Sequence, residues 1–239
     1  MCIRDRHCHT TTSDGALSPT DLLTRYKNAG YDFVAITDHD AFNLDVDVDG
    51  ILHIRSVEFL NGANHSHICA YNIEKMRDLE ETLPSNQGVI DFAKSNGALV
   101  SFPHPTLSYN NLMSEYDDLI NLSEYDFVEI YGYEKKDDGD FIDILLSNGK
   151  KINILATDDY HNDASTPLDS GWIIVNSDTK SKDDILAEIK NGNYYSSNGN
   201  DISISKNNNI ITATSSSASN FIFITNKGNT TVSNVTSAS

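Results

Sequence analysis

The residues of this chain that are best suited to chemistry are histidines placed close to carboxylates. Near its start the chain reads HCHTTTSDG, which places two imidazoles, His7 and His9, one residue apart and Asp14 shortly after them. In an extended strand, residues two apart point to the same face, so His7 and His9 share a face and Cys8 takes the other. We therefore expect Cys8 to be a small buried residue and not a ligand.

Six of the eight histidines fall where an expected strand begins or ends, with acidic residues beside most of them. The histidines are His7, His9, His39, His67, His104 and His161, and the acidic residues are Asp14, Asp38, Asp40, Glu58, Asp158 and Asp159. Strand ends carry the functional sites of α/β folds. Imidazoles and carboxylates without thiolates suit Zn²⁺, Mn²⁺ or Fe²⁺ and do not choose among them. About nine ligands exceed the needs of one ion and indicate a cluster, as used in phosphoester displacement.

The roles of the other two histidines are less clearly indicated by the sequence. His53 lies in the middle of an expected strand, where we expect it to pack or to form a hydrogen bond. His65 lies in an expected loop, close enough to His67 that the two could be confused as ligands.

Alternating helix and strand patterns from Leu17 to about Tyr194 must position these side chains. The first helix is predicted in LSPTDLLTRYKNAG, with Ser18 as its N-cap, Pro19 at its first position and Gly30 at its end. The strand YDFVAIT follows, and ILHIRSVEF is a second strand that we expect to end at Glu58. Repeated β-α units predict mainly parallel strands with helices outside, in a barrel or an open sheet.

After Tyr195 the composition changes to Asn, Ser and Thr with short alternating runs, DISIS, IITAT and FIFIT. We expect residues 196–239 to form a small β-rich extension, and the alternatives are an incomplete extension and a disordered tail. The first six residues, MCIRDR, read as neither strand nor helix, and they resemble translated sequencing-adapter read-through. Our hypothesis is that residues 1–6 are a non-native prefix that replaces a native first strand.

Composition limits the classes of partner and compartment. The chain has 35 acidic and 17 basic residues, a net charge of -18, which repels polyanions and disfavours binding of long nucleic acids. No apolar stretch is long enough to span a membrane, so no membrane partner is expected. Three cysteines without a C-x-x-C pair indicate a reducing compartment and a cytoplasmic protein, with a signal peptide left open if the N-terminus is truncated. The oligomeric state is open.

Several motifs together resemble one known family. HCHTTTSDG and YDFVAITDHD resemble the first two motifs of the PHP (polymerase and histidinol phosphatase) superfamily, and SVEF, HICAYNI, FPHP and TDDYH follow in that family's order. The resemblance covers about residues 7–195. It implies an α/β fold, a distorted (β/α)7 barrel, with three divalent metal ions (Mn, Zn or Fe) and phosphoesterase activity.

The resemblance also implies which residues hold each metal. His7, His9, Glu58 and Asp159 would hold the first, and Glu58 would bridge to a second that His67 and His104 complete. Asp14, His39 and His161 would hold the third. Asp158 is then a candidate for orienting a histidine, and Glu129 is an acidic residue that either supports the site or is solvated at the barrel mouth.

This chain departs from the family pattern in two places. The segment between His39 and Glu58 is short and acidic, where relatives usually have a full helix. Cationic residues that would grip a substrate phosphate are also few, with Arg55, Lys135 and Lys136 as weak candidates.

The leading hypothesis is an enzyme that hydrolyses a phosphomonoester or phosphodiester of a small metabolite or nucleotide through a metal-bridging hydroxide. Glu58 would act as the bridging carboxylate, and Asp14, His39 or His161 would protonate the leaving oxygen. The alternatives are a non-catalytic PHP module that binds metal or phosphate, an exonuclease-like activity on short nucleic-acid ends, and a metallohydrolase that cleaves C–N bonds.

Overall fold

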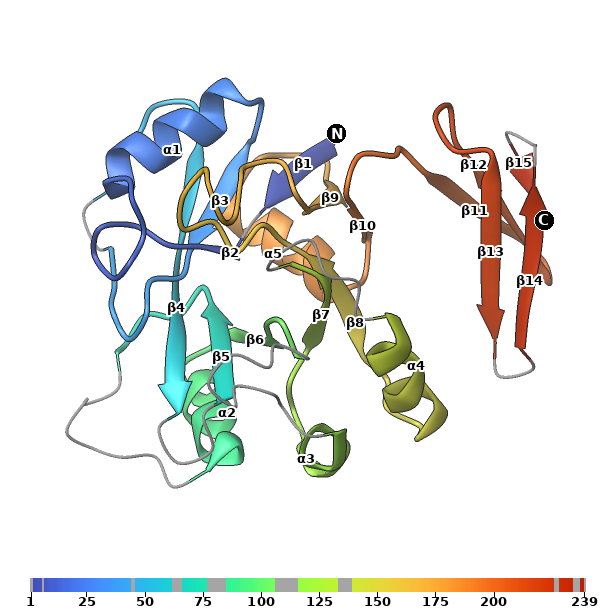
Figure 1. The fold of residues 1–239 in the computed structure, drawn as a ribbon, viewed down its shortest axis with the longest axis horizontal. Coiled ribbons are helices and arrows are strands. Elements are labelled where there is room, and N and C mark those ends of the chain that lie inside the picture. Colours follow the sequence, from blue (N-terminus) through green and yellow to red (C-terminus); the bar gives the residue numbers. More distant parts are fainter. Residues whose placement is uncertain are drawn as a thin grey trace. The chain divides into compact units, whose positions relative to one another are not determined.

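The computed structural model describes residues 2–5, 7–43, 46–61, 66–76, 85–105, 116–132, 139–225, 228–233 and 237–238. The chain divides into two compact units, residues 1–196 and residues 197–239. Each unit is described by itself, because their relative placement is not determined (Figure 1).

The first unit is built around one seven-stranded sheet whose strands neighbour one another in chain order. They are β2 (His7–Cys8), β3 (Phe33–Ile36), β4 (Leu52–Asn61), β5 (Ser66–Tyr71), β6 (Leu99–Phe102), β7 (Phe127–Tyr131) and β8 (Asn153–Ala156). β5 runs antiparallel to β4 and β6, and the other neighbours are parallel. Just after β8, Tyr160 forms a parallel bridge to Cys8, which brings the end of the last strand back to the first. This confirms the predicted distorted barrel.

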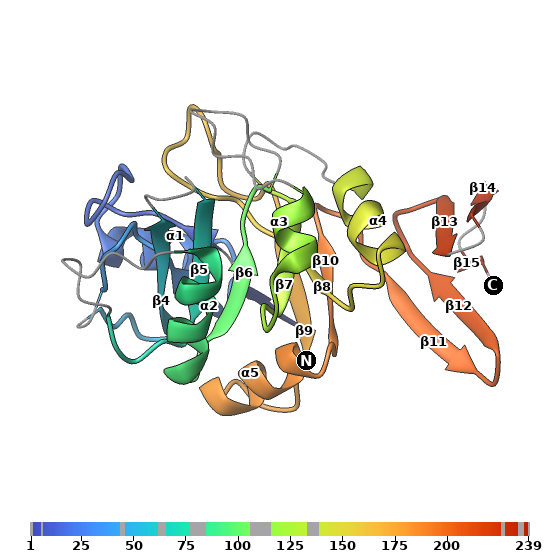
Figure 2. The same ribbon diagram turned by 90° about the horizontal axis from the view of Figure 1, so that it is seen from below.

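The described residues include five helices beside the sheet. They are α1 (Pro19–Asn28), α2 (Asn86–Ser95), α3 (Tyr116–Asn121), α4 (Gly139–Ser147) and α5 (Lys182–Lys190). The predicted start of α1 is confirmed, because the Ser18 side chain accepts a hydrogen bond from the backbone N–H of Asp21. α1 packs against β3, and α2 packs against β5 and β6 (Figures 1 and 2).

Side chains of β4 alternate between the two faces of the sheet, and this alternation places the site. Ile54 packs in one cluster with Phe33 and Phe127. Val57 and Phe59 pack in a second cluster with the apolar face of α2. Glu58 has even spacing from Ile54, so it shares that residue's face and not the face that α2 covers. The burial pattern of the strand therefore directs this carboxylate inward.

The prediction that the first six residues form no regular structure is wrong for Cys2–Asp5. These residues form β1, which pairs antiparallel with β9 (Trp172–Asn176), and β9 lies next to β10 (Tyr194–Ser197). The backbone groups of β9 offer hydrogen bonds to any extended segment, whatever its side chains. The non-native origin of residues 1–6 stays a prediction.

The second unit confirms the predicted β-rich extension. Its strands are β11 (Ser203–Asn207), β12 (Ile210–Thr214), β13 (Asn220–Thr225), β14 (Gly228–Ser233) and β15 (Ser237–Ala238). β11, β12 and β15 form one small sheet, and β13 pairs with β14 in another. Ala213 and Phe221 form its buried apolar cluster. In neither unit do the described residues include a helix both long and apolar enough to cross a membrane.

Candidate metal centre

Four buried side chains converge at one end of the barrel and form the first ligand group. His7, His9, Glu58 and Asp159 present atoms that all lie within 4.8 Å of one another. Nε2 of His7 and Nε2 of His9 each lie 3.0 Å from Oε2 of Glu58. Nε2 of His9 also lies 3.1 Å from Oδ1 of Asp159. The set expected for the first metal is thus brought together from β2, β4 and the loop after β8.

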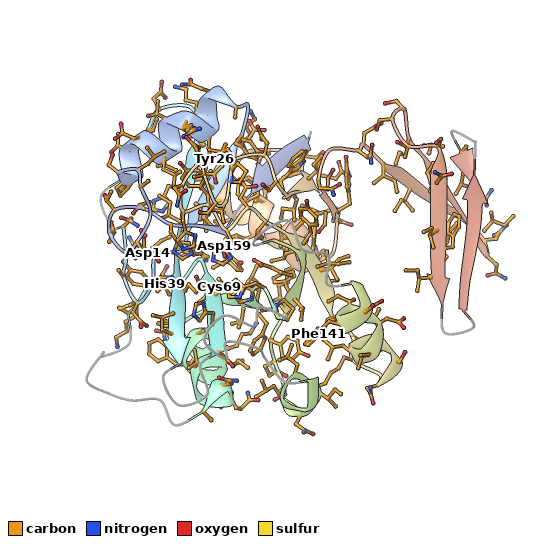
Figure 3. All side chains as sticks on the ribbon, viewed as in Figure 1. Asp14, Tyr26, His39, Cys69, Phe141 and Asp159 are labelled. Atoms are coloured by element: carbon orange, nitrogen blue, oxygen red, sulfur yellow. The ribbon has the colours of Figure 1, made fainter. Side chains whose placement is uncertain are left out.

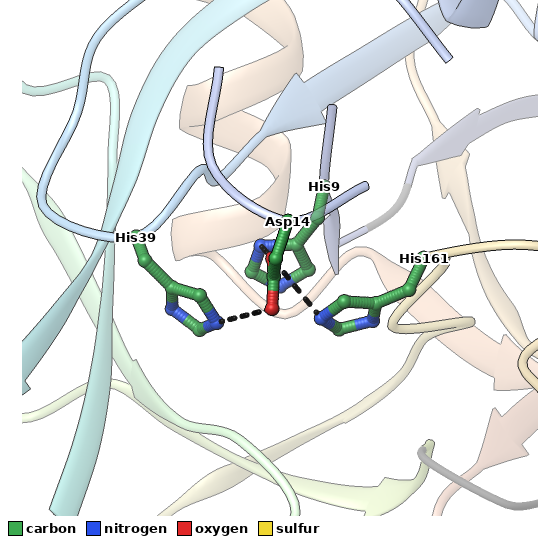
Figure 4. A group of neighbouring side chains, drawn as sticks. All are labelled: His9, Asp14, His39 and His161. Carbon is green, nitrogen blue, oxygen red and sulfur yellow. Dashed lines mark ion pairs between the residues drawn. The ribbon is translucent and has the colours of Figure 1, made fainter. Parts of the chain in front are cut away.

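Figure 4 shows a second group on the more exposed side of the first, made of His9, Asp14, His39 and His161. Oδ2 of Asp14 lies 3.7 Å from Nε2 of His39, and Oδ1 of Asp14 lies 3.5 Å from Nε2 of His161. The rings of His9 and His161 stack with their centroids 4.1 Å apart. The three residues expected for the third metal are therefore neighbours, with His9 beside them.

The third group surrounds the Glu58 carboxylate and includes the neighbours of its other oxygen, Oε1. Oε1 of Glu58 lies 2.7 Å from Nδ1 of His67 and 3.3 Å from Nε2 of His104. His39 also belongs to this group, since Nδ1 of His39 lies 3.4 Å from Oε2 of Glu58. Glu58 thus stands between the first group and this one, as expected of a bridging carboxylate. All nine sequence-predicted ligands gather in one region, where Figure 3 labels Asp14, His39 and Asp159.

Two details of the prediction need correction. Glu58 does not end its strand, because β4 continues to Asn61 and pairs with β5 beyond this point. Arg55 does not face the metal ligands: it is three residues from Glu58 on β4, so it points to the opposite face. The other two candidates for gripping phosphate, Lys135 and Lys136, lie outside the described residues, as does His65.

Glu129 on β7 forms hydrogen bonds with two of the ligand residues. Its Oε1 accepts hydrogen bonds from Nδ1 of His7 at 2.9 Å and from the Thr157 hydroxyl at 3.0 Å. Its Oε2 accepts a hydrogen bond from the backbone N–H of His104 at 2.9 Å. The side chain is fully buried. A carboxylate on one imidazole nitrogen leaves the other nitrogen to face a metal, so Glu129 orients His7 and is not a solvated rim residue.

Asp38 holds the loop that carries Asp14, a role that the sequence did not reveal. Its carboxylate accepts hydrogen bonds from the backbone N–H and the hydroxyl of Thr10, at 2.7 and 2.6 Å, and from the Ser13 hydroxyl at 2.6 Å. Asp158 works in a similar way on another loop, accepting bonds from the backbone N–H groups of Ser170 and Gly171. Runs of Ser and Thr after a histidine motif are the signal that could have predicted such a loop anchor.

Gly15 closes the Asp14 loop against the backbone of its own start. A Cβ atom at this position would lie 2.2 Å from the carbonyl oxygen of His9 and 2.6 Å from the backbone nitrogen of Thr10. We expect Gly15→Ala to displace this backbone, to destabilise the fold by about 3 kcal/mol and to weaken metal binding. Thermal unfolding and metal titration check both effects. Thr11→Ala, in the same loop but exposed, is the control, and equal behaviour of the two variants would contradict the prediction.

Two buried cysteines lie on strands that carry ligands, Cys8 on β2 and Cys69 on β5. Cys8 is fully buried and donates its thiol hydrogen to the carbonyl oxygen of Ala35, which confirms the sequence prediction. Cys69 was not singled out from the sequence, yet its Sγ lies 3.7 Å from Nε2 of His7. Burial raises the pKa of the Cys69 thiol to about 12, so this thiol is protonated in the metal-free chain.

The charges of the group match what metal ions need. Burial alone would raise the pKa of Glu58, but nearby His7 and His67 outweigh it and hold this pKa well below its ordinary value. Burial lowers the pKa of His39 to about 4, so this imidazole is neutral. Nδ1 of His9 and Nδ1 of His39 are buried and form no hydrogen bond within the described part of the chain. Ionised carboxylates, a neutral imidazole and orphaned ring nitrogens fit divalent cations.

Metal binding should release a proton from His9. Burial lowers the pKa of His9 in the metal-free chain, but hydrogen bonds with Asp159 and Glu58 outweigh it and raise this pKa to about 9. A metal must displace that proton, so we expect affinity to rise with pH between about pH 6 and pH 9. Calorimetry in buffers of different ionisation enthalpy measures the release. An affinity independent of pH over this range would contradict the prediction.

Comparison with known proteins agrees with this geometry. The model of the PHP domain family matches residues 5–156, which is more than half of the chain and includes seven of the nine residues of the site. The chain belongs to the PHP domain family. The expectation drawn from the sequence motifs is thereby confirmed.

Two characterised relatives match short stretches of this PHP chain in sequence. It is 53% identical over 36 residues to a 5'-3' exoribonuclease of Haemophilus influenzae, covering 15% of this chain and 13% of the relative. It is 37% identical over 62 residues to a 3',5'-nucleoside bisphosphate phosphatase of Chromobacterium violaceum, covering 26% and 22%. The chain thus spans less than a quarter of either relative.

The fold matches over a longer stretch. A two-domain protein of Bacteroides vulgatus, described as containing a predicted PHP-like metal-dependent phosphoesterase, superposes with a TM-score of 0.66 at 15% identity. The match covers 100% of this chain and 85% of that protein. At this identity the likeness shows a common fold.

Proposed function

We propose that this PHP chain hydrolyses phosphate esters of small metabolites or nucleotides at a site that holds three divalent ions. The observation that carries the proposal is the convergence of nine imidazole and carboxylate side chains into three overlapping groups around Glu58 and His9. His7, His9, Glu58 and Asp159 would hold the first ion, His67 and His104 with Glu58 the second, and Asp14, His39 and His161 the third.

Divalent ions at such a site supply Lewis acidity, which neutralises charge on phosphoryl oxygens and lowers the pKa of bound water. The chain's own contribution is to fix the ligands and to limit access. Eight of the nine have side chains that are at most 18% exposed, whereas the Asp14 side chain is 55% exposed. Substrate therefore approaches from the side of Asp14, His39 and His161.

The three residues proposed to hold the third ion are all poor sources of the proton for the leaving oxygen. A hydrogen bond with His161 holds the pKa of Asp14 well below its ordinary range, so Asp14 stays ionised. The lowered pKa of His39 makes it neutral. Both are therefore poor acids. His161 is a poor acid as well, because an imidazole that holds an ion through Nε2 keeps only its Nδ1 proton, and Nδ1 lies 2.9 Å from the carbonyl oxygen of Asp159, which accepts that proton.

The substrate class is tested with a panel. The partial similarity to a nucleoside bisphosphate phosphatase and to an exoribonuclease makes nucleoside 3',5'-bisphosphates and short RNA suitable probes. The net charge of -18 favours the small substrates. We expect hydrolysis of a monoester or a nucleotide with Mn²⁺, Zn²⁺ or Fe²⁺, loss of activity with a chelator, and recovery on adding metal back.

Metal analysis of the purified chain is the accompanying measurement. Three ions per chain are expected, and fewer than two would contradict the cluster. Hydrolysis that persists after complete metal removal would contradict the proposed function itself.

A further inference from the structure

A second polar cavity lies on the face of β4 opposite to the metal ligands. Its volume is about 240 Å³, less than the roughly 300–1,000 Å³ typical of drug-sized ligands. Its polar lining consists of Asn43, His53, Arg55, Asn72, Glu74 and Lys182. His53 and Arg55 share the strand face of Val57 and Phe59, which α2 covers farther along β4.

The cavity exists because the connection from β3 to β4 does not cover this part of the sheet. In a regular β-α-β unit, a helix would pack over the outer face of β4. Within this connection the described residues, 37–43 and 46–51, include no helix. Polar side chains of β4 therefore face an open space where a barrel of this type would otherwise be apolar.

Two cations in this cavity form no ion pair with any carboxylate in the part of the chain that the structure describes. Among the described residues neither Arg55 nor Lys182 forms an ion pair, although other cations do, as in Lys94 with Asp126 and Arg25 with Asp163. The chain has twice as many acidic as basic residues, so unpaired cations are unexpected. Glu74 is the one carboxylate in the described lining, and it is exposed.

The remaining lining is preformed and neutral. Asn43 is buried and immobilised, since its carbonyl oxygen accepts the Thr12 hydroxyl at 2.7 Å and its amide nitrogen donates to Asp38. His53 adds no charge, because burial and then Arg55 lower its pKa to about 4. Asn72 has a φ of 57°, in the left-handed region, which asparagine adopts more readily than most residues. Its side-chain amide adds a donor to those of Arg55 and Lys182.

We propose that this cavity is an accessory site for a small anion that carries a phosphate group, either free phosphate or a small phosphomonoester. A guanidinium, an ammonium and an amide provide the donors that phosphate oxygens accept, and the guanidinium can bind two of these oxygens at once. The site is separate from the proposed metal centre, because the two lie on opposite faces of β4.

Equilibrium dialysis of the full chain against labelled inorganic phosphate tests the proposal. The measurement is made with bound divalent metal and again with a chelator, so that phosphate on the metal ions is recognised by its loss. We expect the chelated wild type to bind phosphate and the double variant Arg55→Gln, Lys182→Gln to bind it at least tenfold more weakly. Competition with ribose 5-phosphate then distinguishes a phosphomonoester ligand from free phosphate. If the monoester is the better ligand, it will displace the labelled phosphate at a lower concentration than unlabelled phosphate does.

The control is Lys151→Gln with Lys190→Gln, which changes the net charge equally at two exposed lysines outside the cavity. It should bind phosphate as the wild type does. Asn72→Asp is a second test, since it adds a negative charge to the lining and should also weaken binding. Circular dichroism shows that each variant is folded. The proposal is overturned if the chelated wild type binds no phosphate, or if the cavity variants bind it as tightly as the control.

Discussion

His9→Ala is expected to lower phosphoester turnover by at least about a thousandfold while the chain stays folded. His9 belongs to two of the three ligand groups, with Nε2 near Glu58 and Asp159 and Nδ1 3.7 Å from Asp14. Its loss should therefore disturb two ions together. Lewis-acid stabilisation contributes several kcal/mol to such reactions, and each 1.36 kcal/mol is a factor of ten in rate.

The measurement combines steady-state hydrolysis, metal content and circular dichroism. Cys8→Ala is the matched control, because Cys8 is the adjacent residue, at the end of β2, and its side chain lies in the cluster with Leu22 and Tyr26 instead of the site. That variant should keep both its metal and its activity. Normal turnover in a folded His9→Ala protein would contradict the metal assignment, and His104→Ala offers an independent repeat on the other side of Glu58.

Glu129→Gln is expected to weaken metal binding by about 10–100-fold, although the substitution replaces none of the proposed metal ligands. The amide keeps the shape of the side chain but lacks the negative charge that holds the Nδ1 proton of His7 and the backbone N–H of His104. His7 would then present Nε2 to the metal less strongly. Metal titration measures the affinity. Turnover of the variant should be closer to that of the wild type at saturating metal than at limiting metal.

Glu129→Ala should have a larger effect on stability. It leaves His7, the His104 N–H and the Thr157 hydroxyl without their buried acceptor, and each such loss costs about 1–3 kcal/mol. Denaturant unfolding measures this. Glu124→Gln, at an exposed glutamate, is the control and should change neither affinity nor stability. Wild-type metal affinity in Glu129→Gln would show that the carboxylate fills space and does not orient His7.

Much of the fold was predictable from local patterns. The N-cap at Ser18 and the apolar spacing of Leu22, Leu23 and Tyr26 predicted α1, because hydrogen bonding and burial within a helix depend on neighbours a few residues away. The three apolar runs of the C-terminal segment likewise predicted strands. β14 and β15 were not predicted, since their Asn, Ser and Thr content resembles loop sequence until a partner strand supplies hydrogen bonds.

The site was likewise predictable in part. The spacing of His7 and His9 on a strand by itself predicted that these two side chains share one face, and the motifs that resemble the PHP family implied the rest of the ligand set. Only the tertiary structure decided that Glu129 holds His7, that Asp38 holds the Asp14 loop, and that Arg55 faces a different cavity. His7 and Glu129 are 122 residues apart, and they meet because the sheet curls until β2 and β7 line one interior. Periodicity describes the face on which a side chain lies, whereas contact across a barrel depends on strand order and closure.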